Sequence, residues 1–240
     1  MCGRFGVERE YVQLALRYQA VVEAVDPGPR YNVAPTDPAP VVIAHDGERF
    51  LTHHRWGLVP SWAKDLTIGA RMINARSETV ATQPAFRDSL ASRRCVIPAT
   101  RFYEWQRAGG TKVPHSIQRS DGSPMSFAGL WASWRNPTNG ERVLSCTIIT
   151  TVANRMMAPL HDRMPVILDD QALDLWLDPS LTDAGRVLGL IVPCPDDVLS
   201  AYGVSPLVNN VRNEGPELIV PAAEMPMDPS PAAVQQLSFD

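Results

Sequence analysis

The segment MSFAGLWASWRNPTNGERVLSCTIITT (residues 125–151) carries the clearest signal for the fold. Two apolar runs, MSFAGLWASW (125–134) and VLSCTIITT (143–151), flank a polar stretch that contains Pro, Asn and Gly. Aromatic and β-branched runs bounded by such residues are typical of strands joined by a turn. The segment therefore predicts two β-strands in the middle of the chain.

Short apolar runs alternate with turns through the first two thirds of the sequence. They predict further strands in VVIAH (41–45), RFLTHHRWGLV (49–59), RCVIPA (94–99), HSIQR (115–119) and PVILD (165–169). Apolar residues at helical spacing predict one amphipathic helix from Glu8 to Ala24 and shorter helices at Asp169–Leu177 and Asp183–Leu190. The pattern favours an α+β domain with a largely antiparallel sheet and flanking helices.

Length and composition predict a single compact domain. The chain has 240 residues, 45% of them hydrophobic, which is enough for one sizeable core. We expect the domain to cover residues 1–225 and the Pro- and Ala-rich residues 226–240 to form a flexible tail. The absence of a long apolar run argues against a membrane span, and the polar start MCGRFGVERE indicates a cytoplasmic protein, associated with the nucleoid when bound to DNA.

Charge is distributed unevenly along the sequence. Residues 1–163 contain 20 Lys and Arg against 14 Asp and Glu, for a net charge of +6, whereas residues 164–240 carry 2 against 12, for −10. Arginine supplies 20 of the 22 basic residues, and its planar guanidinium suits phosphate. An ordinary solvated surface of mixed charge is an equally good reading of these numbers.

Cys2 is the most reactive candidate in the sequence. Removal of Met1 would give a free α-amine and a thiol on one residue, with ordinary pKa values of about 7.7–8.0 and about 8.5. An aldehyde reacts with such a 1,2-aminothiol to form a Schiff base, which the thiol closes to a five-membered thiazolidine. Arg4 places a cation close by. A cysteine without function at position 2 is the alternative.

Two motifs supply polar side chains that could assist Cys2. In MINARSETV (72–80), Asn74 could hydrogen-bond the amine or the new ring and Arg76 could hold a phosphate; a helix N-cap by Asn or Ser is the alternative. In RFYEWQ (101–106), aromatic neighbours could desolvate Glu104 and raise its pKa, or Glu104 could face water as in any alternating strand.

Two further motifs place a histidine and tryptophans near basic residues. In APLHDRMPVIL (158–168), His161 is a natural proton shuttle, which Asp162 could orient, although Asp162 could equally cap the loop. In HHRWGLVPSWAKD (53–65), tryptophans beside basic residues are typical of platforms for single-stranded bases. We expect Trp56 to lie in the core, and the sequence leaves the position of Trp62 open.

Taken together, these segments resemble the SRAP family, the SOS-response-associated peptidases that crosslink to abasic DNA. The resemblance runs from MCGRF through RYNVAP, RWGLVPSW, INARSET, RCVIPATRFYEW and LHDRMPVIL to VSPLVNNVRNEGPEL, nearly the whole chain except the tail. It implies a compact α+β domain with a barrel-like sheet, and a monomeric protein that binds single-stranded DNA containing abasic sites.

The resemblance also implies residue roles. Cys2 would crosslink, Asn74 would support the adduct, and Glu104 and His161 would move protons. Arg4, Arg76 and Arg163 would contact phosphate, Trp62 would stack on a base, and Thr150 would line the site. The family implies a DNA-damage function with lyase-type Schiff-base chemistry and a self-processing peptidase step that removes Met1, without a metal or organic cofactor.

Two other functions fit parts of the sequence. MCG also opens amidotransferases in which a processed cysteine attacks an amide, so an N-terminal-nucleophile hydrolase is the first alternative. A plain single-stranded nucleic-acid-binding module with an incidental Cys2 is the second. Hydrolysis of glutamine would favour the first, and a covalent DNA adduct would exclude the second.

Overall fold

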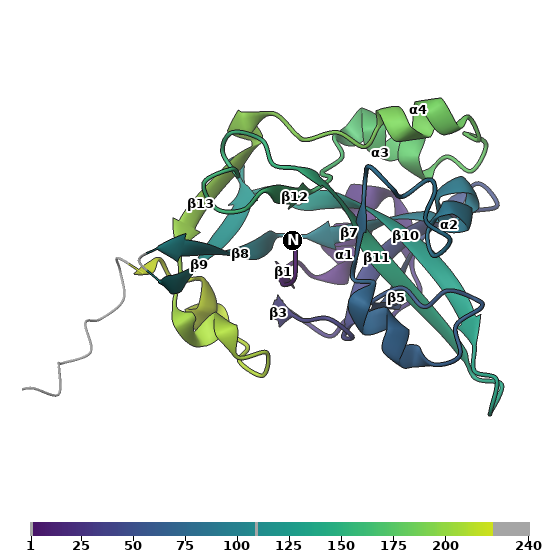
Figure 1. Cartoon of the computed structure of the whole chain (residues 1–240), viewed down its shortest axis with the longest axis horizontal. Helices are drawn as coiled ribbons and strands as arrows, with labels where there is room; N and C mark the ends of the chain where they lie inside the picture. Colours follow the sequence, from purple (N-terminus) through teal and green to yellow (C-terminus); the bar gives the residue numbers. More distant parts are fainter. Residues whose placement is uncertain (1, 109, 223–240) are drawn as a thin grey trace, which may run out of the picture.

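A closed ring of five strands forms the centre of the fold, as seen in a computed structural model that describes residues 2–108 and 110–222 (Figure 1). The strands follow the order β11-β10-β7-β4-β5, and a parallel pairing of β5 with β11, at Arg55–Ser145 and Trp56–Cys146, closes the ring. The ring comprises β4 (Pro38–His45), β5 (Glu48–Trp56), β7 (Arg94–Ala99), β10 (Met125–Arg135) and β11 (Arg142–Val152). The predicted strands at 125–134 and 143–151 are thus confirmed as β10 and β11.

Three short strands extend this sheet. They are β2 (Ala20–Val22), parallel to β5, β6 (Asn74–Arg76), parallel to β11, and β12 (Arg163–Pro165), antiparallel to β11. The C-terminal end of β11 therefore pairs with two strands that come from distant parts of the sequence. Thr150 pairs with Arg76 on one edge and with Pro165 on the other, so β6 and β12 lie on either side of it.

A second sheet of five strands carries the start of the chain. Its order is β13-β9-β8-β1-β3, with β1 (Phe5–Val7), β3 (Arg30–Val33), β8 (Arg101–Ala108), β9 (Thr111–Arg119) and β13 (Leu199–Gly203). Phe5 in β1 lies opposite Phe102 in β8. This antiparallel register holds the residues that precede β1 against β8.

Aromatic side chains join the two sheets. The Phe5 ring packs edge-on against Trp56, 5.0 Å between centroids, and against Phe127, 6.3 Å away. Phe102 contacts the same Phe127 ring at 5.9 Å. All four residues are fully buried, and burial of each large apolar side chain contributes about 1.5–3 kcal/mol. These contacts fix β1 and β8 against the ring.

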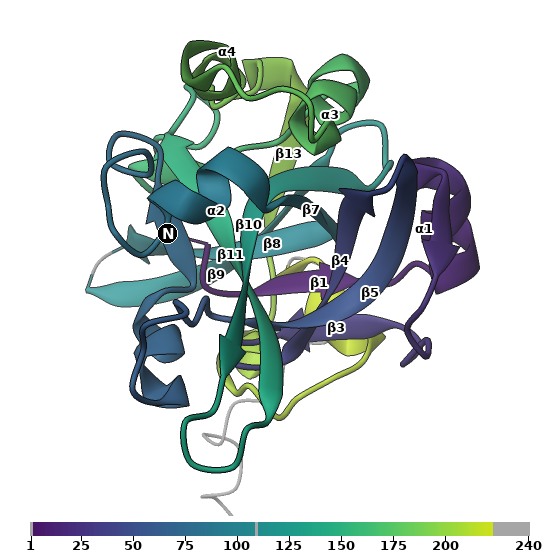
Figure 2. The same cartoon turned by 90° about the vertical axis from the view of Figure 1, so that its right-hand side faces the viewer.

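Short helices cover the outside of the sheets (Figures 1 and 2). The structure contains α1 (Tyr11–Tyr18), α2 (Arg87–Ser92), α3 (Asp170–Leu177) and α4 (Ala184–Gly189), with 3-10 turns η1 (Leu66–Arg71), η2 (Asp196–Val198), η3 (Pro206–Asn209) and η4 (Pro216–Ile219). The helices predicted at Asp169–Leu177 and Asp183–Leu190 are confirmed as α3 and α4. Each begins after an aspartate whose side chain accepts a hydrogen bond from the first turn.

The predicted helix from Glu8 to Ala24 is wrong in its extent. The helix α1 ends at Tyr18, because Gln19 adopts a left-handed conformation with φ of 51°. Residues 20–22 then form strand β2 against β5. The strand predicted at PVILD (165–169) is misplaced, since β12 covers Arg163–Pro165 and shares only Pro165 with it, and beyond β12 only Ile167 forms an isolated bridge, to Phe127. The boundary predicted at residue 225 and the tail 226–240 lie outside the described residues.

Candidate functional site

Cys2 is fully buried and lies three residues before the start of β1. The Asn74 side-chain amide donates a 2.8 Å hydrogen bond from Nδ2 to the Cys2 carbonyl oxygen. Asn74 reaches this position because it opens β6, which pairs with Ile148 on β11. The helix-cap alternative for the MINARSETV motif is therefore not what the structure contains: Asn74 is in a strand and bonds the backbone of Cys2.

Glu104, which is part of strand β8, lies beside Cys2. It is two residues from Phe102 along the strand, so both side chains point to the same face, and only 4% of Glu104 is exposed. The alternative in which Glu104 faces water is thereby excluded. Burial raises the pKa of Glu104 to about 7. A carboxyl with a pKa in this range can take up and release a proton at neutral pH.

The Cys2 thiol is held in its protonated form. Burial raises the pKa of this thiol well above its usual range, and the negative charge of Glu104 raises it further. The effect of Glu104 on Cys2 also means that the two groups are close enough to interact. A thiol in this setting needs a nearby group that accepts its proton before it becomes a strong nucleophile.

His161 and Asp162 approach the same site from the loop before β12. The His161 Nδ1 atom is 2.7 Å from an Asp162 carboxylate oxygen and accepts a 3.0 Å hydrogen bond from the Arg163 backbone N–H. Burial lowers the pKa of His161 from its usual value, although Asp162 acts in the opposite direction. The charge of Asp162 also contributes to the raised pKa of Glu104, so the loop and β8 interact electrostatically.

Arg163 and Thr150 connect this loop to the neighbouring strands. The Arg163 guanidinium makes two hydrogen bonds to the Glu78 carboxylate, at 3.1 and 2.9 Å. It also donates to the Thr150 carbonyl at 2.7 Å and to the Thr150 hydroxyl at 3.3 Å. The structure thus uses Arg163 to tie β11, β12 and the segment after β6 together, and its contact with phosphate stays a prediction.

Arg4 is buried and bonded within the protein. Its Nη1 atom donates to the Asn32 side-chain oxygen at 2.7 Å and to the Val208 carbonyl at 2.9 Å, and its guanidinium lies 5.9 Å from the centre of a Trp105 ring. Burial lowers the pKa of Arg4 from its usual value. A phosphate contact by Arg4 likewise stays a prediction.

Asn32 supports the site although the sequence motifs did not point to it. Its fully buried side chain holds Arg4 and also donates to the carbonyls of Asn210 and Asn213, at 3.0 and 2.9 Å. The available signal was the asparagine in the RYNVAP motif, together with the asparagines of VSPLVNNVRNEG. Asn32 connects β3 to the 205–213 segment and thereby supports the start of the chain.

Arg76 and Trp62 are the predicted DNA contacts that remain accessible. Arg76 is exposed at the end of β6, and its side chain makes no hydrogen bond or ion pair with any residue that the structure describes. Trp62 is 58% exposed, whereas Trp56 is completely buried as predicted. An accessible cation and an accessible aromatic surface therefore lie on either side of Asn74 in the sequence.

Neither a metal cluster nor a membrane-spanning helix is found in the described part of the chain. Within residues 2–108 and 110–222, His, Cys, Asp and Glu do not come together in groups of three or more that could hold a metal ion. None of the helices there has the length and apolar character that crossing a membrane requires.

Sequence comparison places these residues in a known family. Residues 1–211 match the family model described as SOS response associated peptidase (SRAP). The chain is 43% identical to the abasic site processing protein YoqW of Bacillus subtilis (strain 168), over 91% of this chain and 99% of that protein. It is 34% identical to the abasic site processing protein HMCES of Gallus gallus, over 80% of this chain and 66% of that protein.

Solved structures share the fold. A crystal structure of a protein from Bacteroides thetaiotaomicron superimposes with a TM-score of 0.83 at 26% sequence identity, covering 92% of this chain and all of the other. A second, from Bordetella bronchiseptica, gives a TM-score of 0.73 at 28% identity over 85% of this chain. The expected α+β fold with a barrel-like sheet is confirmed by these matches and by the closed ring of strands.

Proposed function

The chain belongs to the SOS response associated peptidase (SRAP) family, and from this premise we propose that it recognises abasic sites in single-stranded DNA and joins itself to them through Cys2. Relatives from Bacillus subtilis and Gallus gallus carry the name abasic site processing protein, which supports an activity on damaged DNA. The observation that carries the proposal is the hydrogen bond from Asn74 to the Cys2 carbonyl, beside the buried Glu104 carboxyl.

The proposed reaction consumes the aldehyde form of the abasic sugar. After Met1 is removed, the Cys2 amine attacks C1′ of the opened sugar, and loss of one water gives an imine. The Cys2 sulfur then adds to C1′ while the imine nitrogen gains the thiol proton. The product is a thiazolidine ring that joins the protein to DNA, and one water is the only molecule released.

Proton transfer during these steps falls to Glu104 and His161. Opening of the cyclic sugar requires a proton on the ring oxygen and loss of one from the 1′-hydroxyl. We assign the first to His161, and we assign to Glu104 the acceptance of protons from the Cys2 amine and thiol. The raised pKa of Glu104, about 7, suits a group that accepts a proton and later returns it.

Asn74 has a positioning role in this scheme. Its amide fixes the Cys2 carbonyl and so limits the directions in which the amine and thiol of that residue can point. Arg76 and Trp62, which are accessible, would contact the DNA on either side of the lesion. Arg4 and Arg163, which bond within the protein, would contact phosphate close to the lesion, and the buried Thr150 would line the site.

Two side reactions belong to the same chemistry. The imine intermediate can undergo strand cleavage at the abasic site, which is a lyase reaction, and closure to the thiazolidine competes with it. Before the first crosslink, attack of the Cys2 thiol on the Met1 carbonyl, followed by hydrolysis of the resulting thioester, would release Met1 and expose the amine.

A denaturing gel of the full chain with abasic single-stranded DNA tests the proposal. Wild-type protein, with Met1 removal verified by mass spectrometry, should give a heat-stable adduct. Cys2→Ala should give none yet retain weak noncovalent binding, whereas Cys2→Ser should give a labile adduct because oxygen closes a less stable ring. Cys194→Ala, which removes a different buried thiol, is the matched control and should behave as wild type. An equal adduct yield from Cys2→Ala would refute the proposal.

A further inference from the structure

Exposed apolar side chains gather on helix α1 and the strand that follows it. Of the eleven large apolar residues that are exposed in the described part of the chain, five fall within residues 12–25. They are Val12, Leu16, Val21, Val22 and Val25, and Leu16 has 77% of its surface exposed. Single exposed apolar residues are ordinary, whereas a contiguous group of them indicates an interaction surface.

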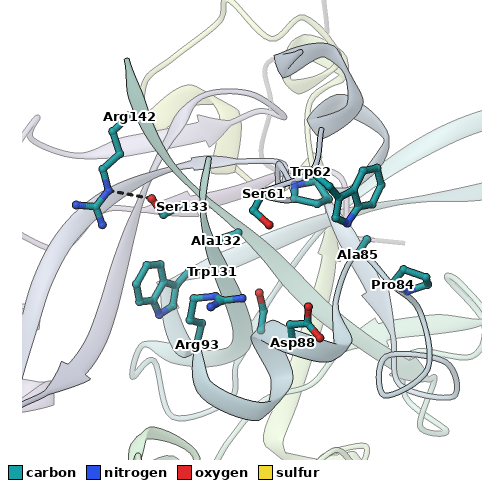
Figure 3. Close-up of a pocket in the computed structure, with 12 residues that line it drawn as sticks. Ser61, Trp62, Pro84, Ala85, Asp88, Arg93, Trp131, Ala132, Ser133 and Arg142 are labelled. Atoms are coloured by element: carbon teal, nitrogen blue, oxygen red, sulfur yellow. Dashed lines mark hydrogen bonds between the residues drawn. The ribbon is translucent and has the colours of Figure 1, made fainter. Parts of the chain in front are cut away.

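These side chains line an open groove between α1 and β2. The groove has a volume of about 660 Å³. Its apolar lining comprises Val12, Ala15 and Leu16 from the helix and Ala20, Val21, Val22 and Ala24 from the strand and the residues after it. The hollow of about 270 Å³ drawn in Figure 3 has a different character, because charged side chains such as Asp88 and Arg93 line it. The groove beside β2 instead suits apolar side chains.

The backbone of β2 offers hydrogen-bonding groups along its outer edge. β2 is the last strand of its sheet, and no strand of the described residues pairs with that edge. The Glu23 N–H donates to the Leu51 carbonyl of β5 at 2.9 Å, and the backbone groups of successive residues in a strand point to opposite edges. The N–H and C=O groups of Val22 therefore point away from β5, where a further strand could bond to them.

The side chains along this edge determine which strand would fit. Ala20 and Ala24 are half-buried, whereas Val21, Glu23 and Val25 are exposed. Side chains at even and odd positions thus lie on different faces, as in any strand. A strand added beside β2 would have one face against α1 and the other next to Glu23.

Acidic residues border the groove. Asp26 accepts a 2.7 Å hydrogen bond from the Tyr11 N–H, so it lies with Glu10 at the start of α1. Arg17 is the one basic residue in the sequence from 10 to 26, and it already pairs with Asp170. A second copy of this chain would bring identical carboxylates to the groove, whereas a segment that contains Lys or Arg would complement them.

We propose that this groove binds an extended segment of another protein in which apolar residues alternate with Lys or Arg. The segment would pair with β2 as an added strand, place its apolar side chains on Val12 and Leu16, and place basic side chains near Glu23. In Figure 2, α1 lies at the edge of the molecule, away from β11, whose C-terminal end pairs with β6 at the Cys2 site. A partner bound here would leave that site free, and the inference holds whether or not Cys2 forms the proposed adduct.

Binding of a designed peptide to the full chain tests the inference. The probe is a fluorescein-labelled peptide of about eight residues, within the usual length of a strand, in which Val and Lys alternate. Its matched control has Glu in place of Lys. In fluorescence anisotropy the wild-type chain should bind the Lys peptide about tenfold more tightly than the Glu peptide, and this difference should shrink as salt is raised.

Hydrogen exchange followed by NMR tests whether the peptide pairs with β2. The Val22 amide should become protected when the Lys peptide binds, because its N–H then donates to the added strand. The Glu23 amide, which already bonds to Leu51, should change little. Binding without protection of the Val22 amide would overturn the inference.

Variants at exposed positions separate the groove from a general attraction between charges. The double variant Val12→Ser/Leu16→Ser should bind the Lys peptide about tenfold more weakly, because it removes the apolar side of the helix. Val25→Ser removes an exposed valine that does not line the groove and should bind as wild type. Thermal melts of both variants should match wild type, since the changed side chains are exposed.

Two further outcomes would also overturn the inference. The first is equal affinity of the wild-type chain for the Lys and Glu peptides. The second is a dimer of the wild-type chain, seen by light scattering, that Val12→Ser/Leu16→Ser converts to a monomer, because the groove would then belong to a second copy of the chain.

Discussion

Glu104 and His161 have pKa shifts in opposite directions, and both shifts come from burial. Burial raises the pKa of Glu104 to about 7, and it lowers that of His161 below its usual value. An ionised Glu104 is therefore favoured only above about pH 7, while a protonated His161 requires lower pH. The assigned roles require an ionised Glu104 and a protonated His161, and these two forms coexist only in a narrow range of pH.

The crosslinking rate should consequently pass through a maximum near neutral pH. His161→Ala should slow the reaction by about 10²–10⁴-fold and remove the decline on the alkaline side, because no protonated imidazole is then needed. Glu104→Gln should slow it by a similar factor and flatten the rise around pH 7, leaving the rise nearer pH 8 that comes from the Cys2 amine. Single-turnover rates across pH 5.5–8.5 check this, with DNA affinity measured in parallel. Wild-type profiles from both variants would remove the two residues from the mechanism.

Glu104 also links stability to pH. A carboxyl whose pKa is raised on folding stabilises the fold fully below its unfolded value of 4.5, and this contribution disappears as pH rises to about 7. Above pH 7 the loss amounts to about 3 kcal/mol. Glu104→Gln, which is always neutral, should match wild type at pH 4.5 and be more stable at pH 8. Urea unfolding at both pH values measures the difference, and a constant difference would contradict the buried, titrating carboxyl.

The sequence indicated the residues of the site but not their bonds. Motifs and the family resemblance point to Cys2, Asn74, Glu104 and His161. The hydrogen bond from Asn74 to Cys2 joins residues 72 positions apart, and no local pattern encodes it. The hydrogen bonds from Arg163 to Glu78 could not be predicted for the same reason. A motif shows that an arginine is present, but it does not show which carboxylate lies next to it in the folded chain.

Among the elements, strand β11 does most to assemble the site. On one edge it pairs with β10 up to Ile148 and then with β12, and on the other it pairs with β5 and then β6. Because β11 changes its pairing partners along its length, β6 and β12 both lie at its C-terminal end. The apolar run at 143–151 predicted this strand correctly, whereas β6 is too short for its periodicity to be recognised.

The β10 strand requires glycine at position 129. A Cβ at this position would lie 2.9 Å from the Ile97 Cδ1 atom and 3.0 Å from the Cys95 sulfur. Gly129→Ala should therefore destabilise the protein by about 1–3 kcal/mol through overpacking of the core. Gly189→Ala, at the end of α4 with open space around it, is the control and should be neutral or slightly stabilising. Thermal unfolding of both variants measures the effect, and equal melting temperatures would contradict the tight packing.

Helix α1 shows where strand pairing overrides local pattern. The spacing of apolar residues from Glu8 to Ala24 fits a helix throughout, yet residues 20–22 join β5 as a strand. Val21 and Val22 are β-branched, and hydrogen bonds to β5 are available to them only in the extended conformation. The strands that form the ring were predictable because their apolar runs are longer and bounded by turns.

At the scale of the whole molecule, the uneven charge predicts how DNA binding responds to salt. Arg76→Ala removes an exposed cation and should reduce the slope of log affinity against log salt by about 0.7 for each phosphate that the protein no longer neutralises, with little change in stability. Arg4→Ala should in addition lower the melting temperature, because it leaves the buried Asn32 side-chain oxygen without the hydrogen bond that Arg4 donates. Arg135→Ala is the surface control. An unchanged salt slope for Arg76→Ala would exclude an interaction between Arg76 and phosphate.

The order of synthesis gives the buried position of Cys2 a further consequence. Cys2 is made well before the residues that bury it, because the loop that carries His161 comes 159 residues after Cys2. At about 5–20 residues per second, synthesis of those residues takes about 8–30 s, and during this time β8, β6 and that loop do not yet enclose Cys2. If Cys2 reacts with aldehydes as we propose, the speed of folding determines how many new molecules keep an unreacted Cys2, and conditions that delay closure of the ring of strands would lower the active fraction without changing any residue of the site.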